Sequence, residues 1–179
     1  MEKTIVQILE HEGVGVFPTD TIYGIVGSAL SRKAVRRIYR LRRRNTKKPM
    51  IILIGSFDDL LMFKIKLEAK VKKALSTFWP GKVSIILPCP IKKFKYLHRG
   101  TNTLAFRLTA KKSLRKLIEK TGPLVAPSAN FEGEPPAKTI REARAYFGDN
   151  VDFYIDGGKL NGRPSSLLRF MEGKVIVLR

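Results

Sequence analysis

Three short polar side chains, Thr19, Asp20 and Thr21, directly follow an apolar run from Val14 to Phe17 that is typical of a strand. Such side chains can cap a helix, accept hydrogen bonds from backbone N–H groups or point hydroxyls into a cleft. One interpretation is therefore a capped strand-to-helix turn. The other is a polar substrate site, because open α/β sheets bind their ligands at the carboxyl ends of strands.

Further polar and basic side chains lie where predicted strands begin or end. Arg42 and Arg44 precede one strand, Arg107 ends a second, and Ser128 and Asn130 follow a third. Each is also compatible with a solvated helix surface or an ordinary turn. Together they predict a cleft that is lined with hydroxyl and guanidinium groups and lacks a nucleophile–base pair. Such a cleft suits an anionic ligand, because arginine holds phosphate or carboxylate through paired charge-assisted hydrogen bonds.

The familiar phosphate and metal motifs are missing from the sequence. There is no GxxxxGK(S/T) and no GxGxxG, so a bound triphosphate would be held by side-chain cations and Mg²⁺. His11 and His98 lie far apart in the sequence, and we interpret neither as a metal ligand. No Ser-His-Asp arrangement is apparent. We therefore expect no protein-held metal and no covalent enzyme intermediate.

The charge of the chain points to a polyanionic partner. Its 179 residues include 35 Lys and Arg against 15 Asp and Glu, a net charge of +20. This favours RNA or a nucleotide over an anionic membrane surface, and a basic solvated face without a partner is the alternative. Cys89 is the only cysteine, which is typical of a reducing compartment. No apolar run could span a bilayer and no signal-peptide core is present, so we expect a cytoplasmic protein without a membrane partner.

The elements that must position these residues alternate between helix and strand. The spacing of apolar residues predicts helices at 5–9, 31–41, 58–62, 67–78, 114–118 and 139–147. Short apolar runs predict strands at 14–17, 50–54, 83–87, 103–108, 124–126 and 153–155, and a hairpin of 165–170 with 174–178 around Glu172 and Gly173. Residues 88–100 are predicted to form a basic loop. This order favours a single α/β domain over residues 1–179, with a twisted mixed sheet and flanking helices.

In their order along the chain, several motifs resemble those of the YrdC-type family, the threonylcarbamoyl-AMP synthases also called TsaC. They are PTDTIYG at 18–24, LRRR at 41–44 with KPM at 48–50, FWPGK at 78–82, LAFR at 104–107, LVAPSAN at 124–130, DGG at 156–158, PSS at 164–166 and VLR at 177–179. Each motif alone is unspecific, but the ordered series covers nearly the whole chain. The resemblance implies the short, single-domain form of a YrdC-like fold with a concave basic face.

The resemblance also implies an activity. Such a protein would be an L-threonylcarbamoyladenylate synthase, a nucleotidyltransferase that makes threonylcarbamoyl-AMP and pyrophosphate from L-threonine, bicarbonate and ATP, with Mg²⁺ carried by ATP. Its implied partners are tRNA or other RNA and the proteins of the tRNA threonylcarbamoyl-transferase complex. The alternative is a non-enzymatic YrdC-like module that binds tRNA or ribosomal RNA through its basic face. Carbamoyl transfer in hydrogenase maturation is disfavoured, because the acylphosphatase and zinc-finger regions that accompany it are absent.

Residue roles follow from the same resemblance. Carried over by position, L-threonine would contact Thr19, Thr21, Arg107, Ser128 and Ser165. ATP would contact Arg42, Arg44, Lys48, Thr103, Asn130 and Arg179, with Arg42 and Arg44 as the catalytic pair.

Three positions depart from the family pattern: Arg42 replaces a lysine, Glu132-Gly133 replaces Ser-Gly, and Ser165-Ser166 replaces Ser-Thr. Arginine and lysine are not interchangeable at a tight phosphate site. We expect Arg42 to point into the cleft, because two arginines two residues apart in an extended loop project to the same side.

Overall fold

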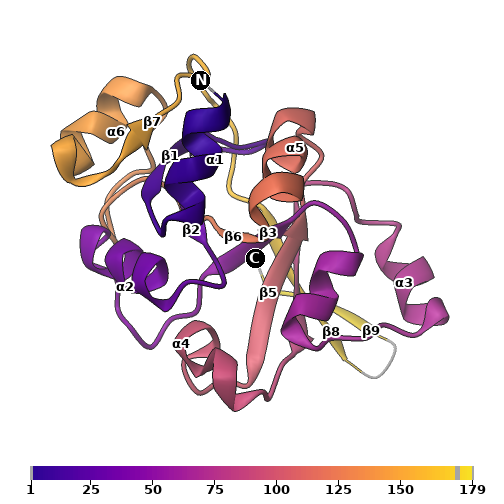
Figure 1. Ribbon diagram of the computed structural model, residues 1–179. Helices are drawn as coiled ribbons and strands as arrows, with labels where there is room; N and C mark the ends of the chain where they lie inside the picture. The colour runs from indigo at the N-terminus through magenta and orange to yellow at the C-terminus, as the bar shows by residue number, and fades with distance from the viewer. Residues whose placement is uncertain (1, 172–173, 179) are drawn as a thin grey trace.

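The computed structural model describes residues 2–171 and 174–178. In this part of the chain, nine strands form one mixed sheet with helices on both faces (Figure 1). The strand order is β7-β1-β2-β6-β3-β5-β4-β8-β9. The strands are β1 (Val14–Pro18), β2 (Tyr23–Ser28), β3 (Ile51–Ile54), β4 (Val83–Pro88), β5 (Thr103–Leu108), β6 (Leu124–Val125), β7 (Phe153–Tyr154), β8 (Ser166–Met171) and β9 (Lys174–Val177). The predicted α/β class with a mixed sheet is confirmed.

Two apolar clusters fix which helix covers which face of the sheet. Helices α1 (Glu2–Glu10) and α5 (Lys112–Thr121) bury Leu9 and Ile118 with Leu53 of β3 on one face. The opposite face carries the larger cluster. It is covered by α2 (Arg32–Leu41), α3 (Ala69–Leu75), α4 (Lys95–His98), α6 (Ile140–Phe147) and the 3₁₀ helices Asp58–Phe63 and Lys92–Phe94; a third 3₁₀ turn, Gly148–Asn150, follows α6.

Helix α2 shows why the sequence folds in this way locally. Ser31 caps its first turn, because the hydroxyl oxygen accepts a hydrogen bond from the backbone N–H of Ala34 at 3.1 Å. Ala34, Val35 and Ile38 lie on one side of the helix and are buried, while Arg36 and Arg40 remain exposed. The basic side of the helix therefore faces solvent. The helix ends at Leu41, and its C-cap residue Arg42 is buried against the turn that follows β6.

Strand β5 places polar residues on the sheet face that α1 and α5 leave partly open. Side chains alternate along a strand, and Leu104 and Phe106 point into the larger cluster. Thr103 and Arg107 therefore point to the other face. Ile51 of β3 pairs with Ala105 of β5, so strands far apart in sequence share this face.

The structure differs from the sequence-based expectation at the first polar turn. Thr19–Thr21 connects two antiparallel strands, β1 and β2, so it is a hairpin turn and not a strand-to-helix turn. Strand β2 was missed because Gly24 and Gly27 lower its strand propensity. Tertiary burial overrides that propensity: Tyr23, Ile25 and Val26 are fully buried.

Smaller differences from the predicted elements concern the length of one helix and the structure of one loop. Helix α3 covers only part of the predicted range 67–78, and the predicted loop 88–100 contains the 3₁₀ turn Lys92–Phe94 and α4. The hairpin of β8 with β9 is confirmed, whereas its turn at Glu172 and Gly173 lies outside the described residues. Among the helices of the described ranges, none has the length and apolar character needed to cross a membrane.

Candidate active site

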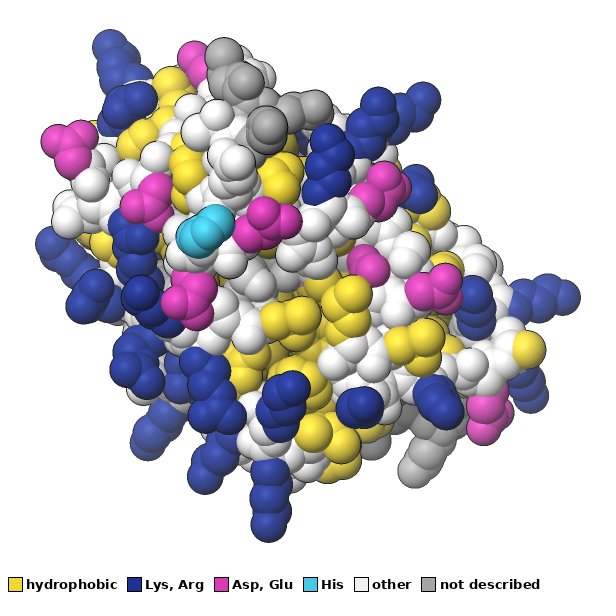
Figure 2. Space-filling view, in the orientation of Figure 1, with side chains coloured by type: hydrophobic (Ala, Val, Ile, Leu, Met, Phe, Trp, Pro, Cys, Tyr) yellow, Lys and Arg dark blue, Asp and Glu magenta, His cyan; other side chains and the backbone are white. Residues whose placement is uncertain are grey.

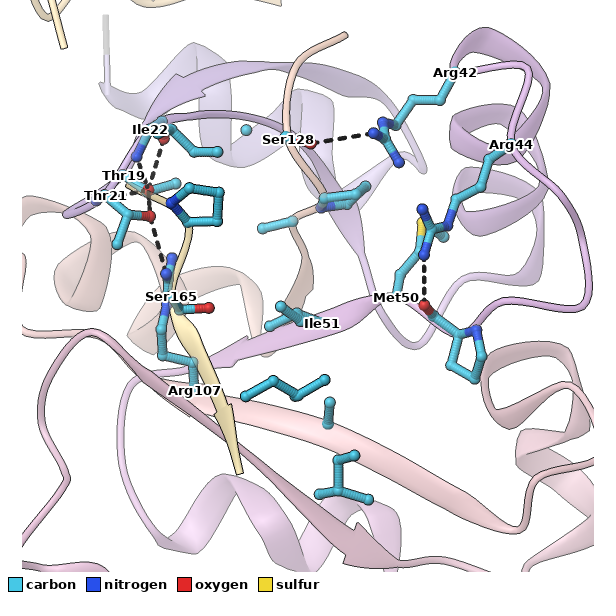
Figure 3. A pocket seen from close by; sticks show the side chains of 18 of the residues that line it. Thr19, Thr21, Ile22, Arg42, Arg44, Met50, Ile51, Arg107, Ser128 and Ser165 are labelled. Atoms are coloured by element: carbon cyan, nitrogen blue, oxygen red, sulfur yellow. Dashed lines mark hydrogen bonds between the residues drawn. The ribbon is translucent and has the colours of Figure 1, made fainter. Parts of the chain in front are cut away.

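A cavity of about 670 Å³ opens on the sheet face that carries Thr103, Ala105 and Arg107. Its floor is formed by β3, β4, β5 and β8, and its walls by the β1–β2 turn, the segment after α2 and the turns that follow β6 and precede β8. Figure 3 shows the polar side chains in two groups, with Thr19, Thr21 and Arg107 on one side of the cavity and Arg42 and Arg44 on the other.

The first group is a connected network at the β1–β2 turn. The Thr19 hydroxyl donates a hydrogen bond to the Ile22 carbonyl at 2.7 Å, and its oxygen lies 3.0 Å from the Thr21 hydroxyl. The Arg107 Nη1 donates to that Thr21 hydroxyl at 3.0 Å, and the Arg107 Nη2 lies 3.2 Å from the Asp20 carboxylate. This side of the cavity therefore presents two hydroxyls next to a guanidinium–carboxylate pair.

Burial dominates the electrostatics of this pair. The Arg107 side chain is only 4% exposed and that of Asp20 is 8% exposed. Burial lowers the pKa of Arg107, and the neighbouring Asp20 charge opposes that shift. Arg107 Nε is buried and meets no hydrogen-bond partner among the described residues, so it retains a donor for a ligand. Asp20 was not among the predicted site residues, although its position between two threonines was a signal for it.

In the second group, Arg42 is held in place by hydrogen bonds to Asn130 and Ser128. Its Nε donates to the Asn130 carbonyl at 3.2 Å, and its Nη2 donates to the Asn130 Oδ1 at 3.0 Å and to the Ser128 hydroxyl at 3.1 Å. Arg42 is 3% exposed. Burial, followed by the nearby Arg44 charge, lowers the pKa of Arg42 to about 10. Arg42 remains a cation near neutral pH, held firmly at the cavity wall.

Arg42 lines the cavity as predicted, but the reason given for its direction was wrong. It is the C-cap of α2 with a helical backbone, φ −82° and ψ −1°, and the next residue, Arg43, has φ +49°. The segment is thus a helix end and not an extended loop. Arg42 points inward because Asn130 and Ser128 supply acceptors for its buried guanidinium.

Lys48 and Asn130, which the resemblance assigned to ATP, do not line the cavity. The Lys48 side chain is 60% exposed, lies outside the cavity lining and pairs with Glu132 at 2.9 Å. Asn130 is buried behind Arg42, where its amide group donates to the carbonyls of Phe131 and Glu134. Asn130 therefore supports the Arg42 guanidinium and does not face the cavity.

The remaining predicted residues have varied positions. Arg44 lines the cavity, and its Nη2 donates to the Pro49 carbonyl at 2.9 Å. Thr103 and Ser165 also line it, and the Ser165 hydroxyl lies 2.8 Å from that of the fully buried Ser84. Arg179 lies outside the described residues.

The sequence-based prediction missed Arg169 and the apolar floor. Arg169 on β8 lines the cavity together with Ile86, Ala105 and Leu167. The register explains this grouping, because Ile86 pairs with Ala105 on one side and with Arg169 on the other. Alternation within the predicted strand 165–170 could have placed Arg169 on the face of Leu167.

Among the described residues, the cavity lining includes four arginines and no Asp or Glu. These arginines are Arg42, Arg44, Arg107 and Arg169. An apolar floor with two buried hydroxyls and Arg107 at one end, and Arg42 and Arg44 at the other, suits a polar anionic ligand or two ligands bound side by side. Residues 2–171 and 174–178 contain no group of three His, Cys, Asp or Glu side chains that could hold a metal ion.

A family model described as Telomere recombination, that of the Sua5, YciO and YrdC proteins, matches residues 7–179. The threonylcarbamoyl-AMP synthase of Klebsiella pneumoniae is 31% identical to this chain over 175 residues, covering 95% of this chain and 91% of the relative. That of Pyrococcus abyssi is 32% identical over 165 residues, covering 91% of this chain and 48% of the relative. The chain thus spans about half the length of the Pyrococcus relative.

A solved structure extends this similarity to three dimensions. The structure of P. abyssi Sua5 complexed with L-threonine superposes on this chain with a TM-score of 0.90 at 29% sequence identity. The match covers 99% of this chain and 53% of the other.

Proposed function

The chain belongs to the Sua5/YciO/YrdC family, and from this premise we propose that it is an L-threonylcarbamoyladenylate synthase. The family resemblance inferred from the ordered motifs is confirmed. The observation that supports the activity best is the cavity with two polar ends. One end offers the Thr19, Thr21 and Arg107 network, and the other offers Arg42 and Arg44.

We assign the first end to L-threonine, as the family resemblance implied. Arg107 is suited to the carboxylate, because its buried Nε has a free donor and guanidinium binds carboxylates through paired hydrogen bonds. The Thr19 and Thr21 hydroxyls are suited to the polar groups of the amino acid. The relative from Pyrococcus abyssi was solved with L-threonine, which supports this assignment.

We assign the second end to the ATP phosphates. Arg42 and Arg44 supply positive charge there, and Thr103 lies along the same cavity. We also propose that Mg²⁺ enters this site bound to ATP, as part of the Mg-ATP substrate. No protein cluster in the described ranges would compete with the phosphate oxygens for the ion.

The proposed reaction follows from the charges that must meet. The amine of threonine adds to bicarbonate with loss of water and gives an N-carboxylate. An oxygen of that carboxylate attacks the α-phosphorus of ATP, the bond to the β-phosphate breaks, and pyrophosphate leaves. Because two anions approach each other, fixed cations such as Arg42 stabilise the transition state. Ser128 accepts a hydrogen bond from Arg42 and lies between the two ends of the cavity (Figure 3), which suits the point where the substrates join.

A pyrophosphate-release assay tests the proposal directly. Protein incubated with L-threonine, bicarbonate and Mg-ATP is expected to release pyrophosphate and to form threonylcarbamoyl-AMP, detected by mass spectrometry. Omission of any one substrate should abolish both products. Pyrophosphate release that does not depend on threonine would contradict the assignment.

We further propose that the product is consumed by a transferase complex acting on tRNA, and that this chain contacts RNA through its basic surface. The supporting observation is the set of exposed cations on and near α2 and α4: Arg36, Arg40, Arg43, Lys92, Lys93 and Lys95. Figure 2 shows Lys and Arg side chains along the lower left of the molecule, over α2 and α4. A cytoplasmic location, expected from the lone cysteine, stays a prediction.

A further inference from the structure

Glu132 holds the segment after α2 against the turn that follows β6. Its carboxylate accepts hydrogen bonds from the Asn45 backbone N–H at 2.6 Å and from the Lys48 ammonium at 2.9 Å. The Arg44 Nη1 lies 3.7 Å from the same carboxylate, and the Glu132 backbone N–H donates to the Arg42 carbonyl at 2.8 Å. One residue thus contacts four positions of the segment that supplies the proposed phosphate-binding arginines.

A second contact beside Glu132 strengthens this link. The Arg43 guanidinium lies 4.0 Å from the centre of the Phe131 ring. Phe131 in turn packs edge-on against Tyr146 and Phe147 of α6, with ring centres 5.1 and 6.1 Å away. The turn that carries Glu132 is therefore backed by the core and provides a firm support for the segment.

Without Glu132, Arg44 would have few fixed partners. Within the described part of the chain, its side chain makes two hydrogen bonds, to the backbone carbonyls of Lys48 and Pro49 at 3.4 and 2.9 Å, and its contact with Glu132 at 3.7 Å is an ion pair. Both acceptors belong to the segment that Glu132 anchors. The Asn45 N–H and the Lys48 ammonium lower the pKa of Glu132, so the carboxylate is charged near neutral pH.

We propose that Glu132 is a positioning residue for nucleotide binding: it fixes Arg44 in the cavity wall and holds Lys48 outside the cavity. This inference rests on the proposed function, because it takes Arg42 and Arg44 as the phosphate-binding groups. Glu132 touches no substrate in this scheme. It acts through Arg44. Its carboxylate also neutralises the Lys48 ammonium, and both of these groups lie outside the cavity lining.

The test compares Glu132→Ala and Glu132→Gln with the matched control Glu134→Gln. Glu134 lies two residues away on the same turn, is exposed, and makes no side-chain hydrogen bond or ion pair among the described residues. Glutamine at 132 keeps an acceptor for the Asn45 N–H but loses the charge. Binding of ATP and of a non-hydrolysable ATP analogue is measured by calorimetry, alongside the KM values for ATP and threonine.

We expect Glu132→Ala to weaken ATP binding and raise the ATP KM about tenfold, because the segment that carries Arg44 loses the charge-assisted hydrogen bonds from Asn45 and Lys48 that hold it to the turn. Glu132→Gln should weaken binding less. The threonine KM should change by no more than about twofold, because the β1–β2 turn is untouched. Glu134→Gln should match the parent in every measurement.

Three results would overturn the inference. The first is unchanged ATP binding in both Glu132 variants, and the second is tighter ATP binding, which would make Glu132 a competitor of the phosphates. The third is an equal rise in both KM values, which would indicate general loosening of the fold. Because nucleotide binding is measured without turnover, a parent protein that releases no pyrophosphate would count against the proposed function and still leave Glu132 testable.

Discussion

Arg42 and Arg107 are both buried arginines of the cavity, but their partners differ. Arg107 is paired with the carboxylate of Asp20 and the hydroxyl of Thr21. Arg42 donates to neutral acceptors, the oxygens of Asn130 and Ser128. Arg107 is therefore part of a nearly neutral network, whereas Arg42 brings positive charge to the cavity. This difference agrees with a carboxylate-binding role for the first and a phosphate-binding role for the second.

The first prediction concerns Arg107. Replacing it with alanine should raise the threonine KM sharply and the ATP KM little, since removing a buried charge-assisted hydrogen bond costs about 1.5–3 kcal/mol. Arg107→Ala also leaves Asp20 buried without its partner, which lowers the melting temperature. Arg107→Lys keeps the charge for Asp20 but loses the planar fork, so its threonine KM should rise while most of the stability remains. An equal loss for both substrates in Arg107→Lys would contradict the assignment.

The second prediction concerns Arg42. Arg42→Ala should lower kcat/KM for ATP at least about tenfold, or roughly 1.4 kcal/mol of transition-state stabilisation. Arg42→Lys should retain most of the activity, because an ammonium can still reach one of the oxygens of Asn130 or Ser128 and supply the charge. Arg40→Ala is the control, since Arg40 is exposed on the last turn of the same helix. Full activity of the alanine variant would contradict the proposed role of Arg42 in binding ATP.

At the scale of elements, the β1–β2 hairpin and the segment between β7 and β8 form the end of the cavity that we propose for L-threonine. The Tyr23 hydroxyl donates to the Gly158 carbonyl at 2.7 Å and accepts from the Gly157 N–H at 2.9 Å. Further along, a Cβ atom added at Gly162 would overlap the carbonyl oxygen of Thr21. Because Gly162 has no side chain, the segment can pass directly over the β1–β2 turn before it reaches Ser165, which lines the cavity.

The third prediction follows from that close approach. Gly162→Ala should push the segment away from the Thr19–Thr21 turn, because the overlap is with backbone that cannot rotate aside. We expect a higher threonine KM and a smaller effect on ATP binding. The control is Asn161→Ala, an exposed neighbour without a side-chain hydrogen bond in the described structure. If Gly162→Ala binds threonine as tightly as the parent, the segment does not shape this end of the cavity.

At the scale of the whole molecule, the excess of positive charge is distributed unevenly. The net charge is +20, yet only four of the basic residues, all arginines, line the cavity in the described part of the chain. Arg37 on α2 is neutralised by Asp152, at 2.6 Å, whereas Arg36 and Arg40 on the same helix are exposed and make no ion pair among the described residues. Helix α2 therefore presents cations to solvent on the side of the molecule where Lys92, Lys93 and Lys95 lie on and just before α4.

The fourth prediction concerns RNA binding by this surface. If it binds RNA, the logarithm of the affinity should fall linearly with the logarithm of the salt concentration, because bound cations release counterions from the phosphates. Arg36→Glu with Arg40→Glu should weaken binding for all sequences alike and reduce the salt slope by about 1 for each phosphate that the variant no longer neutralises. Lys116→Glu, on α5 at the opposite face, is the control. Salt-independent binding, or equal losses in the control, would contradict a role for this surface.

Several features of the fold and the site could be predicted from the sequence, because local physical chemistry determines them. The alternation in Thr103–Leu108 is enough to put Arg107 on the face opposite Phe106. Thr19 and Thr21 line the cavity as expected, and their buried hydroxyls are hydrogen-bonded within the turn and to Arg107, because buried polar groups need partners. The single-domain organisation over residues 1–179 stays a prediction.

Other features depend on partners that lie far away in the sequence, so only the tertiary structure decided them. Lys48 points away from the cavity because Glu132, 84 residues later, binds its ammonium. Asn130 lies behind Arg42 because the guanidinium needs acceptors once it is buried. Asp20 became part of the site only when β5 brought Arg107 beside it. The sequence by itself determined which residue types stand at the strand ends, through local spacing and propensity. The direction of each charged side chain was decided by which long-range partner could satisfy it, because a buried or half-buried charge takes the orientation in which its hydrogen bonds are made.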